Sequence, residues 1–157
     1  MKRNSIYLDT SVLNFFFEER DIEKANSTKE LFREIRQDKF IAFISELVLR
    51  EIGDAPLSKK KLLLSLIKTY PIKILEVTPE FLILMERYME RKIFPLKYRD
   101  DALHIAIASI YDMDIVISWN MEHMVKLRTR REVRAVNILE GYKEIEICTP
   151  LEVIEDD

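Results

Sequence analysis

Short apolar runs alternate with longer segments of helical spacing along the chain. The runs with strand character are residues 6–8, 40–44, 72–77, 115–117 and 145–148. Helical spacing of apolar residues occupies the segments between them, at about residues 11–18, 26–38, 46–53, 58–70, 79–91, 100–112 and 121–128. Two helix starts carry proline at the first helical position, Thr78-Pro79 and Thr149-Pro150. This alternation predicts an α/β fold, a three-layer α/β/α sandwich with a mostly parallel five-stranded sheet, as one domain over residues 1–157.

Two adjacent aspartates begin the segment predicted as a helix at residues 100–112. Asp100 suits the N-cap, since Asp is a favoured cap and its charge matches the positive end of the helix dipole. Asp101 then lacks a capping role, and positions i+4 and i+7 place it on the stripe of Ile105 and Ala108. A carboxylate on such a stripe is costly unless it is paired or binds a cation.

Composition excludes several classes of protein. The chain has 157 residues, of which 48% are hydrophobic, enough for one sizeable core. No apolar run reaches the roughly 18 residues of a membrane helix, so we expect no membrane association. The glycines, Gly53 and Gly141, cannot form a glycine-rich phosphate loop, which argues against a bound nucleotide cofactor. A single cysteine, Cys148, and the absence of an export signal indicate a reducing, cytoplasmic location.

The net charge of −3 differs from that of a general nucleic-acid coat protein, but basic residues cluster locally. Lys59–Lys61 is interpreted as a solvated helix face. A second basic run, Lys126–Arg134, follows soon after Asn120. This run could border the same cleft as the polar residues at the strand ends.

Polar residues follow three of the predicted strands, and in open α/β sheets ligands bind beyond the carboxyl ends of the strands. Asp9 directly follows the first strand and precedes two further candidates for a helix cap, Thr10 and Ser11. One helix start does not require three capping residues, so we expect Asp9 to have a function. The second predicted strand is followed by Ser45, and the fourth by Ser118-Trp119-Asn120.

The helix after the second strand carries two glutamates with different predicted directions. Glu46 stands four residues before Arg50, a favourable surface arrangement. Glu51 lies on the stripe of Leu47 and Val48 and is expected to face the packed side of the helix.

Asp9, Glu51 and Asp101 are thus predicted to meet at one edge of the sheet. Crowded carboxylates repel one another, and a hard divalent cation removes that repulsion. Oxygen ligands suit Mg²⁺ or Mn²⁺ rather than Zn²⁺, and neither His104 nor His123 lies in a zinc-binding pattern. His104, one turn after Asp101, either orients that carboxylate, contacts substrate or is an ordinary helix residue. Carboxylate-bound Mg²⁺ without a nucleotide loop points to phosphate chemistry.

Four stretches, IYLDTSVLNFF, ISELVLREI, DDALHIAIA and IVISWN, occur in an order and spacing that resemble those of the PIN-domain family, which includes the VapC-type toxin ribonucleases. The resemblance covers about residue 5 to Cys148. It implies cleavage of RNA phosphodiester bonds with Mg²⁺ or Mn²⁺, and for VapC-type members a small antitoxin partner and frequent dimerisation. It places Asp9, Glu51 and Asp101 as the catalytic and metal-binding acids, with Thr10 or Ser11 as the hydroxyl after the first aspartate and Ser118 as the residue ending the fourth strand.

One position departs from the family pattern. Many members have a fourth acid where this chain has Asn120, whose amide oxygen is an acceptable ligand for a hard cation but supplies no charge. Three explanations remain open: Asp100 compensates, the second metal site is weak, or activity has been lost.

The leading hypothesis is a metal-dependent endoribonuclease, with the toxin of a toxin–antitoxin pair as one form of it. The alternative is a PIN-like RNA- or protein-binding domain with little or no cleavage. A receiver-like signalling domain has less support, because it requires a lysine at the end of a later strand. The predicted strands here are instead followed or ended by Ser45, Thr78, Ser118 and Cys148. A haloacid-dehalogenase-type phosphatase needs a second aspartate at the position of Ser11.

Overall fold

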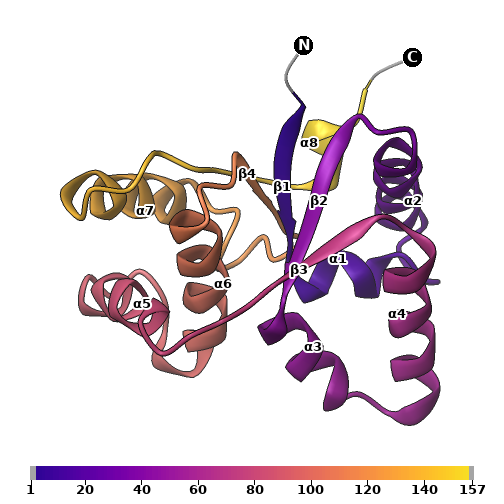
Figure 1. Ribbon diagram of the computed structural model, residues 1–157, viewed down its shortest axis with the longest axis horizontal. Coiled ribbons are helices and arrows are strands. Elements are labelled where there is room, and N and C mark those ends of the chain that lie inside the picture. The colour runs from indigo at the N-terminus through magenta and orange to yellow at the C-terminus, as the bar shows by residue number, and fades with distance from the viewer. Residues whose placement is uncertain (1–2, 156–157) are drawn as a thin grey trace.

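β-branched and large apolar residues form five short strands at the centre of the molecule (Figure 1). The computed structural model describes residues 3–155, so the ends of the predicted domain, residues 1–2 and 156–157, lie outside the described residues. The strands are β1 (Asn4–Leu8), β2 (Phe40–Ser45), β3 (Ile72–Leu75), β4 (Ile115–Ile117) and β5 (Glu146–Cys148). All pairings are parallel, in the order β3-β2-β1-β4-β5. The predicted five-stranded parallel sheet is confirmed.

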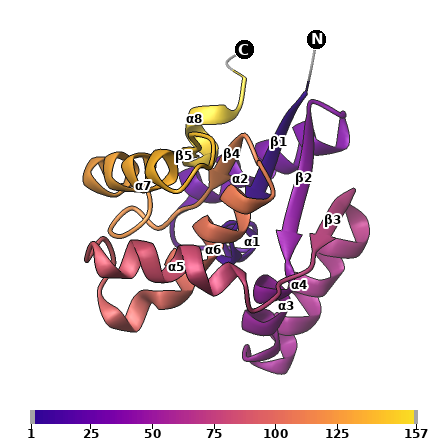
Figure 2. The same ribbon diagram turned by 60° about the vertical axis from the view of Figure 1, so that its left-hand side comes forward.

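Two layers of helices cover the sheet, because the side chains of each strand alternate between its faces. Ile6 and Leu8 of β1 belong to one buried cluster and Tyr7 to the other. The layer on the face of Ile6 comprises α1 (Thr10–Phe15), α2 (Ile22–Arg36), α3 (Glu46–Gly53) and α4 (Leu57–Thr69). The layer on the face of Tyr7 comprises α5 (Phe81–Glu90), α6 (Arg99–Ile110) and α7 (Leu127–Leu139). Figures 1 and 2 show these layers on opposite sides of the strands, as the α/β/α prediction requires.

Helix α6 occupies the most enclosed position in its layer. Every residue from 102 to 109 is buried, so this helix has no solvent-facing stripe in that part. A short 3₁₀ helix, Leu96–Tyr98, leads directly into it. The start of α6 therefore lies where the enclosed part of the helix meets the surface.

The helix predicted at residues 121–128 is wrong. Residues 121–126 form turns and bends, and the helix of this region is α7 (Leu127–Leu139). Thr129, Val133 and Val136 form its buried face at spacings of four and three residues. Arginines between these positions conceal this short apolar stripe in the sequence.

One of the two proline-marked helix starts differs from the prediction, and the other matches it. Helix α5 begins at Phe81 rather than at the predicted Pro79, with Glu80 at its N-cap position. The start at Thr149-Pro150 is confirmed in α8 (Pro150–Val153), where Thr149 and Glu152 form a capping box.

The central strand β1 has β2 on one side and β4 on the other. The chain therefore builds the sheet outward in both directions from β1, and this reversal creates a crevice at the carboxyl end of β1, the usual ligand position in such folds. No described helix combines the length and apolar character needed to cross a membrane.

Candidate active site

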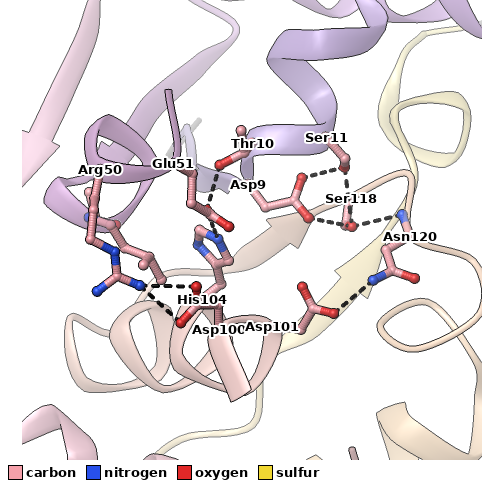
Figure 3. Close-up of polar contacts among 12 residues, drawn as sticks. Asp9, Thr10, Ser11, Arg50, Glu51, Asp100, Asp101, His104, Ser118 and Asn120 are labelled. Carbon is pink, nitrogen blue, oxygen red and sulfur yellow. Dashed lines mark hydrogen bonds and ion pairs between the residues drawn. The ribbon is translucent and has the colours of Figure 1, made fainter. Parts of the chain in front are cut away.

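Asp9 immediately follows β1 and is held by three hydrogen bonds. Its Oδ1 accepts from the Ser11 hydroxyl at 2.5 Å and from the Val12 amide at 3.3 Å. Its Oδ2 accepts from the Ser118 hydroxyl at 2.6 Å. The residue is 3% exposed, so this carboxylate is a buried cap of α1 with a fixed orientation (Figure 3). The structure thus brings the predicted Asp9, Ser11 and Ser118 together.

Glu51 projects from α3 into the same site, where its Oε1 accepts two hydrogen bonds. One comes from the Thr10 hydroxyl at 2.7 Å and the other from His104 Nε2 at 2.6 Å. Because a carboxylate only accepts, Nε2 of His104 carries its proton. The remaining oxygen, Oε2, has no hydrogen bond to the described part of the chain.

The other ring nitrogen of His104 continues a buried chain of polar groups. Nδ1 lies 2.6 Å from the Tyr7 hydroxyl, which lies 2.7 Å from the Ser45 hydroxyl. Ser45 also accepts from the Leu47 amide at 3.2 Å, which caps the start of α3. With a neutral imidazole every group in this chain has a partner of the correct type. His104 therefore orients Glu51 rather than Asp101.

Asp101 lies in the first turn of α6, half-buried and facing the end of β4. Its Oδ2 accepts from Nδ2 of Asn120 at 3.0 Å. The amide orientation follows from the other side of Asn120, where Oδ1 accepts from the His123 backbone amide at 3.0 Å. The oxygen of Asn120 that the sequence suggests as a metal ligand is thus already bonded to the β4–α7 loop.

Asp100 is not the predicted N-cap. Helix α6 begins at Arg99, with Tyr98 at the N-cap position and no side-chain capping bond. Both oxygens of Asp100 instead accept from Nη2 of Arg50, at 3.0 and 2.9 Å, and Figure 3 shows this pair turned away from Asn120. Asp100 therefore forms an ion pair with α3 and lies apart from the position of Asn120.

Arg50 also fails to make its expected pair with Glu46. Glu46 remains exposed, as the sequence predicts, but its Oε1 accepts from the Val77 backbone amide at 2.7 Å. Arg50 reaches across to α6 because Asp100 offers it two carboxylate oxygens at once.

The pKa values of the three acids are shifted in different directions. Burial raises the pKa of Asp9 despite the hydrogen bonds from Ser11 and Ser118. Burial also raises the pKa of Asp101 to about 6, assisted by the negative charges of Asp9, Glu51 and Asp100. For Glu51, burial opposes ionisation, but the bonds from His104 and Thr10 outweigh it and lower the pKa.

Burial shifts the pKa of His104 in the direction opposite to its effect on a carboxyl group. Burial lowers its pKa, but the hydrogen bond to Glu51 and the charges of Glu51, Asp9 and Asp101 raise it overall. The charges of Asp9 and Glu51 thus act on both Asp101 and His104, which places these four groups within electrostatic reach of one another.

The donor chemistry of this site fits a hard divalent cation. Three carboxylates converge and offer oxygen ligands, and burial disfavours the charges of two of them, Asp9 and Asp101. Within the described residues, no three His, Cys, Asp or Glu side chains already have a metal-binding arrangement. Neutral donors hold the carboxylates in place, so a shared ion would require side-chain rotation, most easily at Asp101, whose Oδ1 has no bond to the described chain.

Three residues contribute to the site without having been predicted: Tyr7, Ser45 as a partner of Tyr7, and Arg50 as the partner of Asp100. Strand periodicity could have identified the first two. Alternation along β1 and β2 places Tyr7 and Ser45 on one face of the sheet, where the Tyr7 hydroxyl contacts both Ser45 and His104 of α6. The Arg50–Asp100 pair had no such signal, because it depends on the packing of two helices 50 residues apart.

Comparison with known proteins places this arrangement in a family. The solved structure of VapBC2 from Rickettsia felis, bound to a DNA fragment from their promoter, matches with a TM-score of 0.57 and 11% sequence identity. The match covers 92% of this chain and 98% of that one, and it shows likeness of fold. No curated protein matches significantly. The family model of the PIN domain matches residues 6–120, a range that includes Asp9, Glu51, Asp101 and Asn120. The chain therefore belongs to the PIN domain family.

Proposed function

We propose that this chain is a Mg²⁺- or Mn²⁺-dependent endoribonuclease that hydrolyses RNA phosphodiester bonds, with Asp9, Glu51 and Asp101 as catalytic, metal-binding carboxylates. The observation that carries the proposal is the convergence of these three acids at the strand-order reversal, where burial disfavours the charges of Asp9 and Asp101 and repulsion by the neighbouring acids adds to this at Asp101. Membership of the PIN family supports nuclease chemistry. A divalent ion bound there supplies an acidified water and neutralises charge on the phosphoryl oxygens.

The residues of this chain prepare that site in distinct ways. Ser11 and Ser118 fix the direction of the Asp9 carboxylate. His104 and Thr10 hold one oxygen of Glu51 and leave the other available. Such fixed neighbours of metal-binding groups reduce the reorganisation that binding requires.

The alternative is a PIN-like domain that binds RNA or protein without efficient cleavage. The presence of Asn120 in place of an acid favours it, since the fourth position donates to Asp101 instead of adding charge. Asn120 enters our proposal as a neighbour that positions Asp101 and as a metal ligand through the second lone pair of its amide oxygen.

Cleavage of labelled single-stranded RNA with Mn²⁺ and with EDTA distinguishes the two functions. We expect cleavage with Mn²⁺ only, and a loss of about a hundredfold or more for Glu51→Gln, the scale of removing one group that stabilises transition-state charge. Glu46→Gln is the matched control, because Glu46 lies on the same helix and is exposed. Binding of RNA without cleavage would establish the alternative, and cleavage that persists in EDTA would contradict the metal dependence.

The proposal extends to a partner protein. The resemblance to VapC-type toxin ribonucleases, and the fold likeness to VapBC2, support a small antitoxin that binds this chain. Co-expression with the gene adjacent to its own, followed by affinity purification, tests this: a stable complex that suppresses RNA cleavage is expected, and unimpaired cleavage in the presence of that product would contradict it.

A further inference from the structure

A cavity of about 430 Å³ lies between the segment before α6 and the loop from β4 to α7. Ile93 and Phe94, both buried, provide an apolar wall. Lys92, Lys126 and Arg128 lie on its exposed side. The cavity thus combines an apolar surface for a base with a basic surface for phosphates, the two surfaces that bind single-stranded nucleic acid.

The three cations of this cavity are available for a ligand. In the part of the chain that the structure describes, none of them forms an ion pair or side-chain hydrogen bond. Glu122 is the acid that lines the cavity, with its side chain 82% exposed. The cavity therefore carries excess positive charge in a chain whose net charge is −3.

An aromatic pair lies at the edge of the cavity nearest to α6. The rings of Tyr98 and His123 are 4.0 Å apart between centroids and inclined by 32°. His123 lines the cavity, and the ammonium of Lys97 lies 5.2 Å from the centroid of the Tyr98 ring. Rings beside a basic surface are the features on which bases of single-stranded RNA stack.

Two hydrogen bonds link His123, which lines this cavity, to the candidate catalytic residue Asp101. The His123 amide donates to Asn120, and Asn120 donates to Asp101, each at 3.0 Å. Tyr98 immediately precedes α6, one turn before Asp101. One side chain, Asn120, therefore links His123 of the aromatic pair to the candidate catalytic carboxylate, and Figure 3 shows its bond to Asp101.

We propose that the cavity is a subsite for one nucleotide of a single-stranded RNA substrate, next to the phosphate that is cleaved. Lys92, Lys126 and Arg128 bind the adjoining backbone phosphates, and the base stacks at His123. This inference rests on the proposed function, and it assigns one nucleotide position of the substrate to this cavity. The basic run predicted from the sequence contributes only its first part, because Arg130, Arg131 and Arg134 line a different cavity beside β5.

Equilibrium binding of a fluorescent single-stranded RNA to the Glu51→Gln protein tests the cation part without cleavage. For the double variant Lys126→Ala/Arg128→Ala we expect at least tenfold weaker binding. The slope of log affinity against log salt should also fall by about 0.7 for each phosphate that the protein no longer neutralises. Lys59→Ala/Lys61→Ala on α4 removes the same charge from exposed lysines elsewhere and is the matched control. Equal reductions of affinity in both double variants, or no reduction in the first, would overturn the subsite.

A ring series tests the stacking part separately. His123→Phe should retain affinity, and His123→Ala should weaken it by about fivefold or more, the scale of stacking one base on one ring. Both should leave the salt slope unchanged, since the cations that bind phosphate stay in place. Glu122→Gln should tighten binding by removing repulsion. A changed salt slope in His123→Ala, or equal affinity of the Phe and Ala variants, would overturn stacking at His123.

The two proposals fail in different ways. If the wild-type protein binds RNA through the cavity but does not cleave it, the endoribonuclease proposal is contradicted and the subsite proposal is supported. If the Lys126→Ala/Arg128→Ala variant cleaves RNA normally with Mn²⁺ and with unchanged KM, the subsite proposal is contradicted and the endoribonuclease proposal is supported.

Discussion

Asp100 and Asp101 are adjacent in the chain, but they meet different surroundings. The Asp100 side chain is 49% exposed and both of its oxygens face Arg50. Asp101 is half-buried, receives one hydrogen bond from Asn120 and is repelled by Asp9 and Glu51. One carboxylate pairs with a cation of the protein, and the other has only a neutral amide donor.

Asp101→Asn should therefore leave the melting temperature unchanged or raise it in chelator at neutral pH. Burial and neighbouring charges raise the pKa of Asp101 to about 6, so its ionised form opposes folding above that pH. Asn keeps the shape, and its carbonyl can still accept from Asn120. The same variant should lose the stabilisation that Mn²⁺ gives to the wild type, since ligand binding to the folded state raises stability by mass action. A lower melting temperature in chelator with an undiminished gain from Mn²⁺ would make Asp101 a structural residue.

The apolar stripe that Asp101 shares with Ile105 and Ala108 is weak evidence for the direction of its side chain. All residues from 102 to 109 are buried, and only His104 and Ser109 among them are polar, so almost any direction from Asp101 along this helix meets apolar residues. The stronger signal in the sequence is the position of Asp9, which directly follows β1 at the carboxyl edge of the sheet.

At the level of elements, the Arg50–Asp100 pair joins α3 to α6 across the acid cluster. We expect Asp100→Ala to destabilise the protein by less than about 1 kcal/mol, the usual range for exposed ion pairs. In an Arg50→Ala background the same change should cost almost nothing. Urea unfolding of the two single variants and the double variant measures this coupling. A cost for Asp100→Ala that is the same in both backgrounds would indicate a capping role that the structure does not show.

The elements themselves were largely predictable, and their exceptions have physical causes. Strands of a buried parallel sheet stand out as short β-branched and aromatic runs such as Ile115–Ile117. Helix α7 was displaced in the prediction because its buried face is narrow and lies within an arginine-rich sequence. The chain of hydrogen bonds from Ser45 through Tyr7 and His104 to Glu51 could not be predicted, because it joins residues up to 97 positions apart. Such contacts depend on strand order and helix placement together.

Considered as a whole, the molecule uses the two ends of its sheet differently. Asp9, Glu51 and Asp101 gather at the reversal of strand order where a ligand can bind, and burial disfavours the charges of Asp9 and Asp101. The amino ends contain Asp114, which accepts from the Ser5 amide at 2.8 Å, the Ser5 hydroxyl at 3.1 Å and Lys143 at 3.1 Å. Burial opposes ionisation of Asp114, but these three donors outweigh it and lower its pKa.

This contrast predicts opposite behaviour for the same chemical change at the two ends. Because folding lowers the pKa of Asp114, its stabilisation is present above about pH 4, the ordinary carboxyl value, and is lost as pH falls through the lower folded value. Asp114→Asn should therefore lower the free energy of unfolding at pH 7, and this difference should shrink toward pH 3. Mn²⁺ stabilisation should remain, whereas Asp101→Asn should abolish it.

Urea unfolding in chelator at pH 7, 5 and 3 measures the difference between the wild type and Asp114→Asn. Asp112→Asn is the control, since Asp112 is exposed and its positive φ of 55° is one that Asn tolerates well. A difference that stays constant across this pH range would mean that Asp114 stabilises β1 and β4 through shape rather than charge. If it shrinks as expected while Mn²⁺ stabilisation persists, the charge at the amino ends serves stability, and the charge at the carboxyl ends is left to bind the ligand.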